Sequence, residues 1–303
     1  MQTLQHILAA VDLSAATRAV LERGYQLAAA HRARYTVLHV LNLEALAFLR
    51  GLLGDKAAGV SARLLQQARE DLQAQLAGVQ AAAGVAVQPL VLEGVAGTVV
   101  PQQAQQADLL LAGAHGSGFL QTLLLGSTVS RLVRKSPAPV LVVKQMPQGP
   151  YRRVLVPVDF SAASALTVEL ARRLVPGADL ELLHVFEVPF EGKLQFAGVD
   201  ELVQQQLRQE ARERAVQQLH ALAAQAGLEP AQYTARVLHG EAVHEVVAQA
   251  RRDRCDLIVM GKHGTHVTEE LLLGSVTQRV LAESEADVLV VGQRPHQAAA
   301  GAA

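Results

Sequence analysis

The chain has 303 residues, of which 50% are hydrophobic and 18% charged, and its 27 basic and 28 acidic side chains give a net charge of −1. This composition excludes a disordered chain, and without a basic excess a general nucleic-acid or anionic-membrane binder is disfavoured. Aromatic residues make up only 3%, which also disfavours base-stacking surfaces. At about 150 residues per domain, the length predicts two domains.

The cysteine content and the distribution of apolar residues narrow the possible class of protein further. The single cysteine, Cys255, excludes an internal disulfide and a cysteine-cluster metal site. The first residues lack the basic start and apolar stretch of a secretory signal, and no apolar run approaches the ~18 residues of a membrane span. We therefore expect a cytoplasmic protein that binds no metal through its side chains and has no membrane or nucleic-acid partner.

In chain order, the first half carries a series of short motifs. They are Ile-Leu-Ala-Ala-Val-Asp-Leu-Ser at 7–14, Val-Leu-His-Val at 37–40, Val-Leu-Glu-Gly at 91–94, Leu-Leu-Leu-Ala-Gly-Ala-His-Gly at 109–116 and Leu-Leu-Leu-Gly-Ser at 123–127. Closely similar motifs recur in the same order at 154–161, 182–185, 237–240, 257–264 and 271–275. Self-similarity at a fixed offset indicates a duplicated domain. The segment 145–150, with two prolines and a glycine, separates the predicted domains 1–146 and 151–294.

The second half shows the element pattern most clearly. Continuous apolar segments at 154–158, 180–185, 257–260 and 288–291 are typical of strands buried on both faces. Amphipathic segments between them predict helices, one capped by Ser161 and a longer one over about 199–225. Each repeat is therefore predicted to be an open, doubly wound α/β domain with five parallel strands.

In such sheets, ligands bind beyond the carboxyl ends of the strands, where the strand order reverses. Residues of unusual chemistry stand at those ends in both repeats. Asp12 and Asp159 end the first predicted strands, and Gly113 and Gly261 end the fourth. We therefore expect a ligand site between the first and fourth strands of each repeat.

The glycines after the fourth strand form the same pattern twice. Two glycines with two residues between them are followed by nine residues and a Gly-Ser pair, at Gly113, Gly116, Gly126 and Ser127 and again at Gly261, Gly264, Gly274 and Ser275. Helices are predicted to begin at the two serines, and the free N–H groups of a helix N-terminus favour anions. The spacing is neither a Walker loop nor a dinucleotide fingerprint. Glycines that merely shape a strand–turn–helix corner are the alternative interpretation.

Together with the Val-Asp-Leu/Phe-Ser openings and the segment Pro-Val-Leu-Val-Val at 139–143, this pattern resembles the universal stress protein family in its tandem form. The resemblance covers nearly the whole chain. It implies Rossmann-like sheets of strand order 3-2-1-4-5 with helices on both faces, ATP or a related adenine nucleotide at the switch point, possible Mg²⁺ on the nucleotide, and a role in the stress response.

The family's nucleotide-binding positions carry over to both repeats. In the first repeat they are Asp12, Val40, Gly113, Gly116, Gly126 and Ser127. In the second repeat they are Pro157, Asp159, Val185, Met260, Gly261, Gly264, Gly274, Ser275, Val276 and Thr277. The first repeat has Ala10, Ala112 and Val129 where the second has Pro157, Met260 and Thr277. Because a threonine hydroxyl could bind phosphate, the second domain is predicted to be the better site.

The sequence contains no positioned base or arginine finger beside the predicted phosphates, so no catalytic residue is predicted. The main prediction is a nucleotide-binding regulator. Two alternatives stay open, a slow ATPase and a nucleotide-free scaffold that binds another small molecule or a partner protein. The family resemblance further suggests that the edge strands at 140–143 and 288–291 pair within the chain as a pseudo-dimer, and a homodimer is possible.

Some polar residues have a structural interpretation beside a functional one. His39 and His184 end apolar strands and are predicted to be hydrogen-bonded structural histidines, and His115 and His263 are predicted to fill turns in the glycine loops. Arginines near Cys255 could lower its pKa, although a solvated helix end is the commoner meaning of such a cluster. Segments 41–59 and 186–199 are interpreted either as lids or as packed crossovers.

Overall fold

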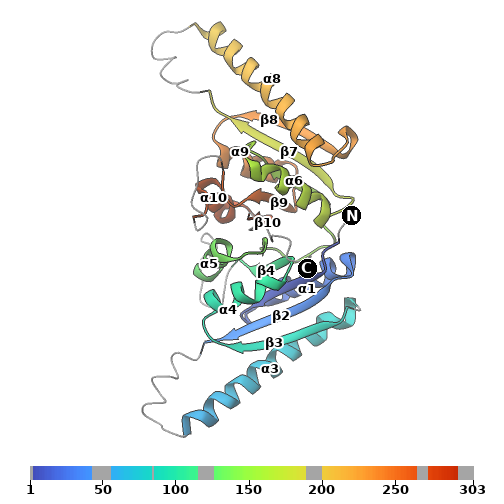
Figure 1. The fold of residues 1–303 in the computed structure, drawn as a ribbon, viewed down its shortest axis with the longest axis vertical. Helices are drawn as coiled ribbons and strands as arrows, with labels where there is room; N and C mark the ends of the chain where they lie inside the picture. The colour runs from blue at the N-terminus through green and yellow to red at the C-terminus, as the bar shows by residue number, and fades with distance from the viewer. Residues whose placement is uncertain are drawn as a thin grey trace, which may run out of the picture. The chain divides into compact units, whose positions relative to one another are not determined.

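A computed structural model describes residues 3–42, 56–83, 85–114, 126–188, 200–264 and 272–292 (Figure 1). The chain divides into two compact units, with the boundary between Pro150 and Tyr151. We call residues up to Pro150 unit 1 and residues Tyr151–Val291 unit 2. The domain limits 1–146 and 151–294 stay a prediction. The lid predictions concern segments that lie largely outside the described residues.

Unit 1 alternates strands and helices along the chain, as predicted for βαβ units. Its elements are β1 (His6–Val11), α1 (Thr17–His31), β2 (Arg34–Leu41), α3 (Lys56–Ala83), β3 (Val87–Glu93), α4 (Ala96–Gln103), the 3₁₀ turn η1 (Ala104–Gln106), β4 (Leu109–Gly113), α5 (Ser127–Lys135) and β5 (Val140–Val143).

Unit 2 repeats this order. Its elements are β6 (Arg153–Pro157), α6 (Ala162–Leu174), β7 (Asp179–Phe186), α8 (Glu201–Gln225), η2 (Pro230–Gln232), β8 (Tyr233–His239), α9 (Ala242–Arg252), β9 (Leu257–Gly261), α10 (Ser275–Glu283) and β10 (Asp287–Val291). The four strands predicted in this half are confirmed to within one residue at each end. Both helices predicted to begin at Ser127 and Ser275 are also confirmed.

The strand order of each unit is the predicted 3-2-1-4-5. In unit 1 the order is β3-β2-β1-β4-β5, and in unit 2 it is β8-β7-β6-β9-β10. Neighbouring strands within each unit are parallel. The order reverses between β1 and β4 and again between β6 and β9, which is where such sheets bind ligands.

Helices cover both faces of each sheet. In unit 1, α1 packs against α3 and α4 packs against α5, and in unit 2 the pairs are α6 with α8 and α9 with α10. The strands β4 and β9 are buried except at their last residue. Their sequences are continuously apolar because neither of their faces is exposed to water.

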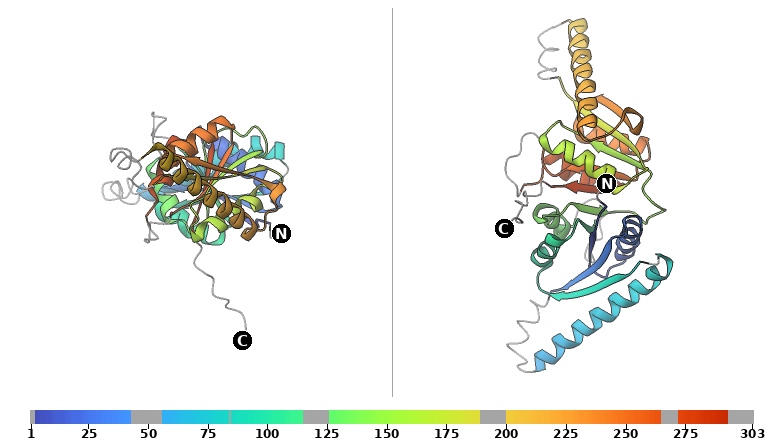
Figure 2. Two further views of the ribbon diagram at one scale, coloured as in Figure 1. Left: turned by 90° about the horizontal axis from the view of Figure 1, so that it is seen from above. Right: turned by 45° about the vertical axis from the view of Figure 1, so that its right-hand side comes forward.

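Among the described helices, the one between the second and third strands is the longest in each unit. Helix α3 has 28 residues and α8 has 25, and both continue past the strands that they cover (Figures 1 and 2). The side chain of Asp200 caps α8 by accepting a hydrogen bond from the Leu202 N–H at 2.9 Å. No helix in the described part is long and apolar enough to span a membrane.

Candidate functional site

The turn after the first strand has the same strained geometry in both units. Leu13 has a φ of 61° and Phe160 a φ of 59°, in the left-handed region that costs a residue with a side chain about 1–3 kcal/mol. The preceding aspartates stabilise this turn. Asp12 accepts a hydrogen bond from the Ser14 N–H at 3.1 Å, and Asp159 accepts one from the Ser161 N–H at 3.0 Å. Because both units retain a strained residue at this position, we infer that the direction of the turn is important.

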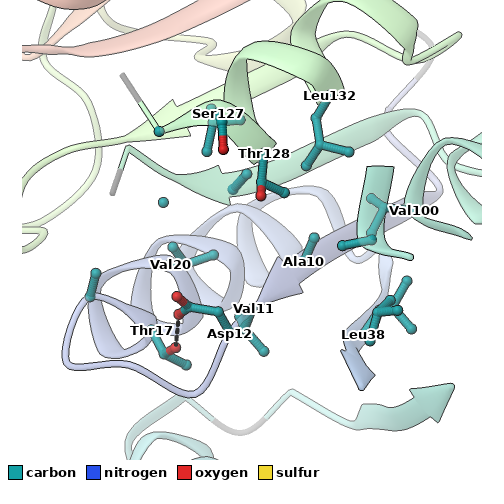
Figure 3. A pocket seen from close by; sticks show the side chains of 17 residues that line it. Ala10, Val11, Asp12, Thr17, Val20, Leu38, Val100, Ser127, Thr128 and Leu132 are labelled. Atoms are coloured by element: carbon teal, nitrogen blue, oxygen red, sulfur yellow. Dashed lines mark hydrogen bonds between the residues drawn. The ribbon is translucent and has the colours of Figure 1, made fainter. Parts of the chain in front are cut away.

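A cavity of about 340 Å³ lies at the switch point of unit 1 (Figure 3). Its walls come from the ends of β1, β2 and β4 and from α1, α4 and α5. Five of the six residues predicted for this site line it, namely Asp12, Val40, Gly113, Gly126 and Ser127. The sixth, Gly116, lies outside the described residues. Residues that were predicted from motifs far apart in the sequence thus line one cavity.

The cavity has an apolar side and a polar side. Leu38, Val100 and Leu132 lie on one side, whereas Asp12 and Thr17 lie on the other, next to Val20 (Figure 3). The Thr17 hydroxyl donates to the Asp12 carboxylate in a long hydrogen bond of 3.5 Å. Such a division suits a ligand with an apolar ring system and a polar remainder.

The N-terminus of α5 forms part of the cavity wall. Gly126 occupies the N-cap position and provides no side-chain cap. Its own N–H donates to the carbonyl of Ala114 at 3.1 Å, which fixes the loop end against β4. Ser127 and Thr128 follow, and their hydroxyls point toward the cavity (Figure 3). Uncapped amides and two hydroxyls therefore supply hydrogen-bond donors for an anion.

In unit 2, the glycine loop begins directly over Asp159. A Cβ placed on Gly264 would lie 2.8 Å from Asp159 Oδ2, so only glycine fits there without moving the carboxylate. The carboxylate also accepts a hydrogen bond from the Ser164 hydroxyl at 2.9 Å. Gly274 closes the loop by donating its N–H to the Lys262 carbonyl at 3.0 Å. The structure thus brings Asp159, Gly264 and Gly274 together around one loop.

The hydroxyl of Thr277, predicted to bind phosphate, is hydrogen-bonded within the protein. The Thr277 side chain is 4% exposed, and its hydroxyl donates to the Gly261 carbonyl at 2.8 Å. It therefore ties α10 to the end of β9. The matched Val129 is buried as well. The expected hydroxyl–phosphate contact is not supported by this geometry, so it no longer argues for the second site over the first.

Two of the remaining predicted residues of unit 2, Pro157 and Met260, are larger than their unit 1 counterparts. Ala10 and Ala112 are cross-strand neighbours in unit 1 and both line the cavity. Pro157 and Met260 stand at the matched positions, and Met260 is buried. A methionine occupies volume that an alanine leaves open. Of the other predicted residues of unit 2, Val185 lies near the end of β7, Ser275 begins α10 and Val276 follows it.

The strand-end histidines are structural, as predicted. Nδ1 of His39 lies 2.9 Å from the Val11 carbonyl, and Nδ1 of His184 lies 2.9 Å from the Val158 carbonyl. A carbonyl only accepts, so this ring nitrogen carries the proton in both. Burial lowers the pKa of His184, and the ring of Phe160 packs on it at 4.3 Å. His115 lies outside the described residues.

Sequence reasoning missed the cavity residues that come from helices. Thr17, Val100, Thr128 and Leu132 line the hollow, yet in the sequence they are ordinary positions of amphipathic helices. Two signals could have found the polar pair. Thr17 stands five residues after Asp12, and Thr128 directly follows the Gly-Ser pair.

The arginines near Cys255 do not give this thiol a low pKa, so the interpretation of an arginine-activated cysteine is wrong. Burial and the nearby charges of Glu181, Asp253 and Asp256 raise its pKa to about 12. A thiol in this state is a poor nucleophile and metal ligand. No group of three or more potential metal-ligating side chains occurs in the described part of the chain.

Comparison with known proteins gives consistent results. The family model of the universal stress protein family matches residues 3–144 and again 150–292. A universal stress protein of Mycolicibacterium smegmatis is 27% identical over 298 residues, covering 95% of this chain and 97% of that protein. One from Methanocaldococcus jannaschii is 32% identical over 144 residues, covering 46% of this chain and 82% of that protein.

A solved structure supports the fold at the level of the whole chain. The universal stress protein of Archaeoglobus fulgidus, 20% identical, covers 96% of this chain and 98% of its own with a TM-score of 0.65. The double family match extends over nearly all of the sequence. The chain therefore belongs to the universal stress protein family and carries two of its domains in tandem.

Proposed function

We propose that this protein binds an adenine nucleotide such as ATP and acts as a stress-response or regulatory module without strong catalytic activity. The observation that carries this proposal is the unit 1 cavity, which collects five predicted nucleotide-binding residues at the switch point. Its volume of about 340 Å³ is at the small end of the range for small-molecule sites. A nucleoside-sized group fits such a hollow.

The two sides of the cavity suit the two parts of a nucleotide. The base would pack between the apolar side chains of Leu38, Val100 and Leu132. The phosphates would lie at the start of α5, where amide N–H groups and the hydroxyls of Ser127 and Thr128 donate. Any Mg²⁺ would be held mainly by phosphate oxygens, and Asp12 is the carboxylate among the described residues that line the cavity.

The chemistry of the cavity favours binding over turnover. Asp12 is the one ionisable side chain among the described residues that line it. Rapid phosphoryl transfer needs several positioned charges around the transferred group. We therefore propose that any ATP hydrolysis is slow and incidental. Pairing of the two edge strands into a pseudo-dimer, homodimer formation and a cytoplasmic location stay predictions.

We further propose that unit 1 is the tighter site, which reverses the order suggested by the sequence. Ala10 and Ala112 leave room where unit 2 has Pro157 and Met260. The hydroxyl of Thr277, the main argument for unit 2, is engaged with the Gly261 carbonyl. What still supports unit 2 is its fuller match to the family motif.

Native mass spectrometry of the purified full chain tests the proposal. We expect a bound adenine nucleotide, or stoichiometric uptake when ATP is added. An empty chain that takes up no ATP or AMP, or one that carries a different small molecule, would overturn the proposal in favour of the scaffold alternative. A phosphate-release assay on the same sample addresses the ATPase alternative, because turnover comparable to ordinary enzymes, above about 1 s⁻¹, contradicts a binding module.

A further inference from the structure

Two matched arginines in the last helix of each unit have different surroundings. In unit 2, Arg279 is held by two carboxylates. Its Nη1 lies 3.1 Å from Glu241 Oε1, and its Nε lies 3.1 Å from Glu283 Oε1. The charge of this arginine is therefore balanced within the protein, and little of it is left to attract a ligand.

In unit 1, the matched Arg131 lacks such partners. The positions that correspond to Glu241 and Glu283 are Val95 and Lys135. In the described part of the chain, no hydrogen bond or ion pair involves the Arg131 side chain. Helix α5 itself contains no acidic residue that could pair with Arg131.

A glycine on the neighbouring helix lets Arg131 lie across the start of α4. A Cβ placed on Gly97 would come within 2.5 Å of Arg131 Cδ and 3.2 Å of its Nη1. Unit 2 has Val243 at the matched position, which is buried. The path that the Arg131 side chain takes in unit 1 therefore depends on the missing side chain at Gly97.

Arg131 lines a second hollow of about 260 Å³ beside the main cavity. Asn42, Gly97, Ser127 and Thr128 also line it. Ser127 and Thr128 line the main cavity too, so the two hollows meet along the first turn of α5. A ligand whose ring fills the apolar side of the main cavity could place an anionic group in this second hollow.

We propose that Arg131 is a specificity residue of the unit 1 site, where its guanidinium binds a phosphate group of the ligand and selects nucleotides over nucleosides. This inference rests on the proposed nucleotide binding. A guanidinium forms charge-assisted, often bidentate hydrogen bonds with phosphate. Because Arg131 is exposed to solvent, we expect the contact to change affinity by about tenfold and not by several orders of magnitude.

Isothermal titration of the full chain with ATP, AMP and adenosine tests this role. The unit 1 signal is identified as the one that Ala112→Met removes. We expect Arg131→Gln to weaken ATP and AMP binding there by about tenfold and to leave adenosine binding unchanged. The matched Arg279→Gln should not alter the unit 1 affinities. Gly97→Val, which copies unit 2, should reproduce the Arg131→Gln result by blocking the path of the side chain.

The outcomes separate the two proposals. If Arg131→Gln leaves ATP affinity unchanged, or weakens adenosine as much as ATP, the arginine does not bind phosphate, whereas the proposed nucleotide binding still stands. If the wild-type chain binds neither ATP nor adenosine, both proposals fail. Thermal unfolding of each variant excludes a general loss of folding as the cause.

Discussion

The two units share one backbone geometry, but the side chains at their sites differ in size and in charge balance. Both retain the strained residue after the first strand, the strand-end histidine bonded to a carbonyl, and the uncapped glycine before the last helix. They differ where side chains set volume and charge. Unit 1 has Ala112 and an arginine for which the described residues provide no acidic partner, whereas unit 2 has Met260 and an arginine held by two carboxylates. Duplication has preserved the geometry of the turns more strictly than the contents of the pocket.

The largest expected effect concerns a residue that only unit 2 has. Cys255 takes the place of Ala107 in unit 1, and its pKa of about 12 leaves very little thiolate at pH 8. We expect iodoacetamide to modify it about a thousandfold more slowly in the folded chain than in the urea-unfolded chain. Mass spectrometry of timed samples measures both rates. Similar rates would show that this end of unit 2 is open, contrary to the described packing.

The size difference between the two sites is tested by exchanging the residues that cause it. Ala112→Met should fill the unit 1 cavity and weaken nucleotide binding there by about a hundredfold, or ~2.7 kcal/mol. The fold should tolerate the change, because unit 2 holds methionine at the matched strand position. Titration with ATP measures the loss. The reciprocal Met260→Ala is the control and should leave the unit 1 affinity as it is.

If Ala112→Met retained full affinity while Met260→Ala altered the stronger binding event, the assignment of the tighter site to unit 1 would be contradicted. The order predicted from the sequence motifs would then hold. The exchange thus distinguishes the two orders without removing any glycine of the loops.

The close approach of Asp159 to the glycine loop is tested by Gly264→Ala. The added Cβ would lie 2.8 Å from the carboxylate oxygen, so the loop or the aspartate must shift. We expect unit 2 to lose about 1–3 kcal/mol of unfolding free energy, as for other overpacked sites. Urea denaturation measures the loss. Gly78→Ala, on α3 with open space around the glycine, is the matched substitution and should stabilise by up to ~1 kcal/mol.

The smallest expected effect belongs to Val129→Thr. If the hydroxyl of Thr277 serves to tie α10 to β9, then a threonine in unit 1 would make the same bond to the end of β4 and change nucleotide affinity less than twofold. Titration with ATP checks this result. A gain of about tenfold would restore the phosphate-binding role that the sequence suggested for Thr277.

The fold could be predicted from the sequence because its signals are local and occur twice. Continuous apolar strands, amphipathic helices and glycine loops recur at a nearly constant offset, and each copy supports the interpretation of the other. The same holds for the meeting of Asp12 with Gly113 and Gly126, because parallel strands place their carboxyl ends at one edge.

The contents of the site could not be predicted in the same way, because they depend on contacts between residues far apart in the chain. The sequence motif identifies Thr277 as a candidate residue, but it does not determine whether the hydroxyl faces a ligand or a backbone carbonyl. The balance of charge on Arg279 depends on Glu241, 38 positions earlier, and the path of Arg131 depends on a glycine in another helix. These contacts are determined by side-chain packing, which cannot be predicted from the spacing of residues in the sequence alone.

A crystal structure of the full chain grown with ATP would test the central claim most directly. We predict electron density for an adenine nucleotide in unit 1, with the base beside Leu38 and Val100 and a phosphate within hydrogen-bond distance of the Arg131 guanidinium. Nucleotide density in unit 2 alone, with the unit 1 cavity empty, would contradict this account.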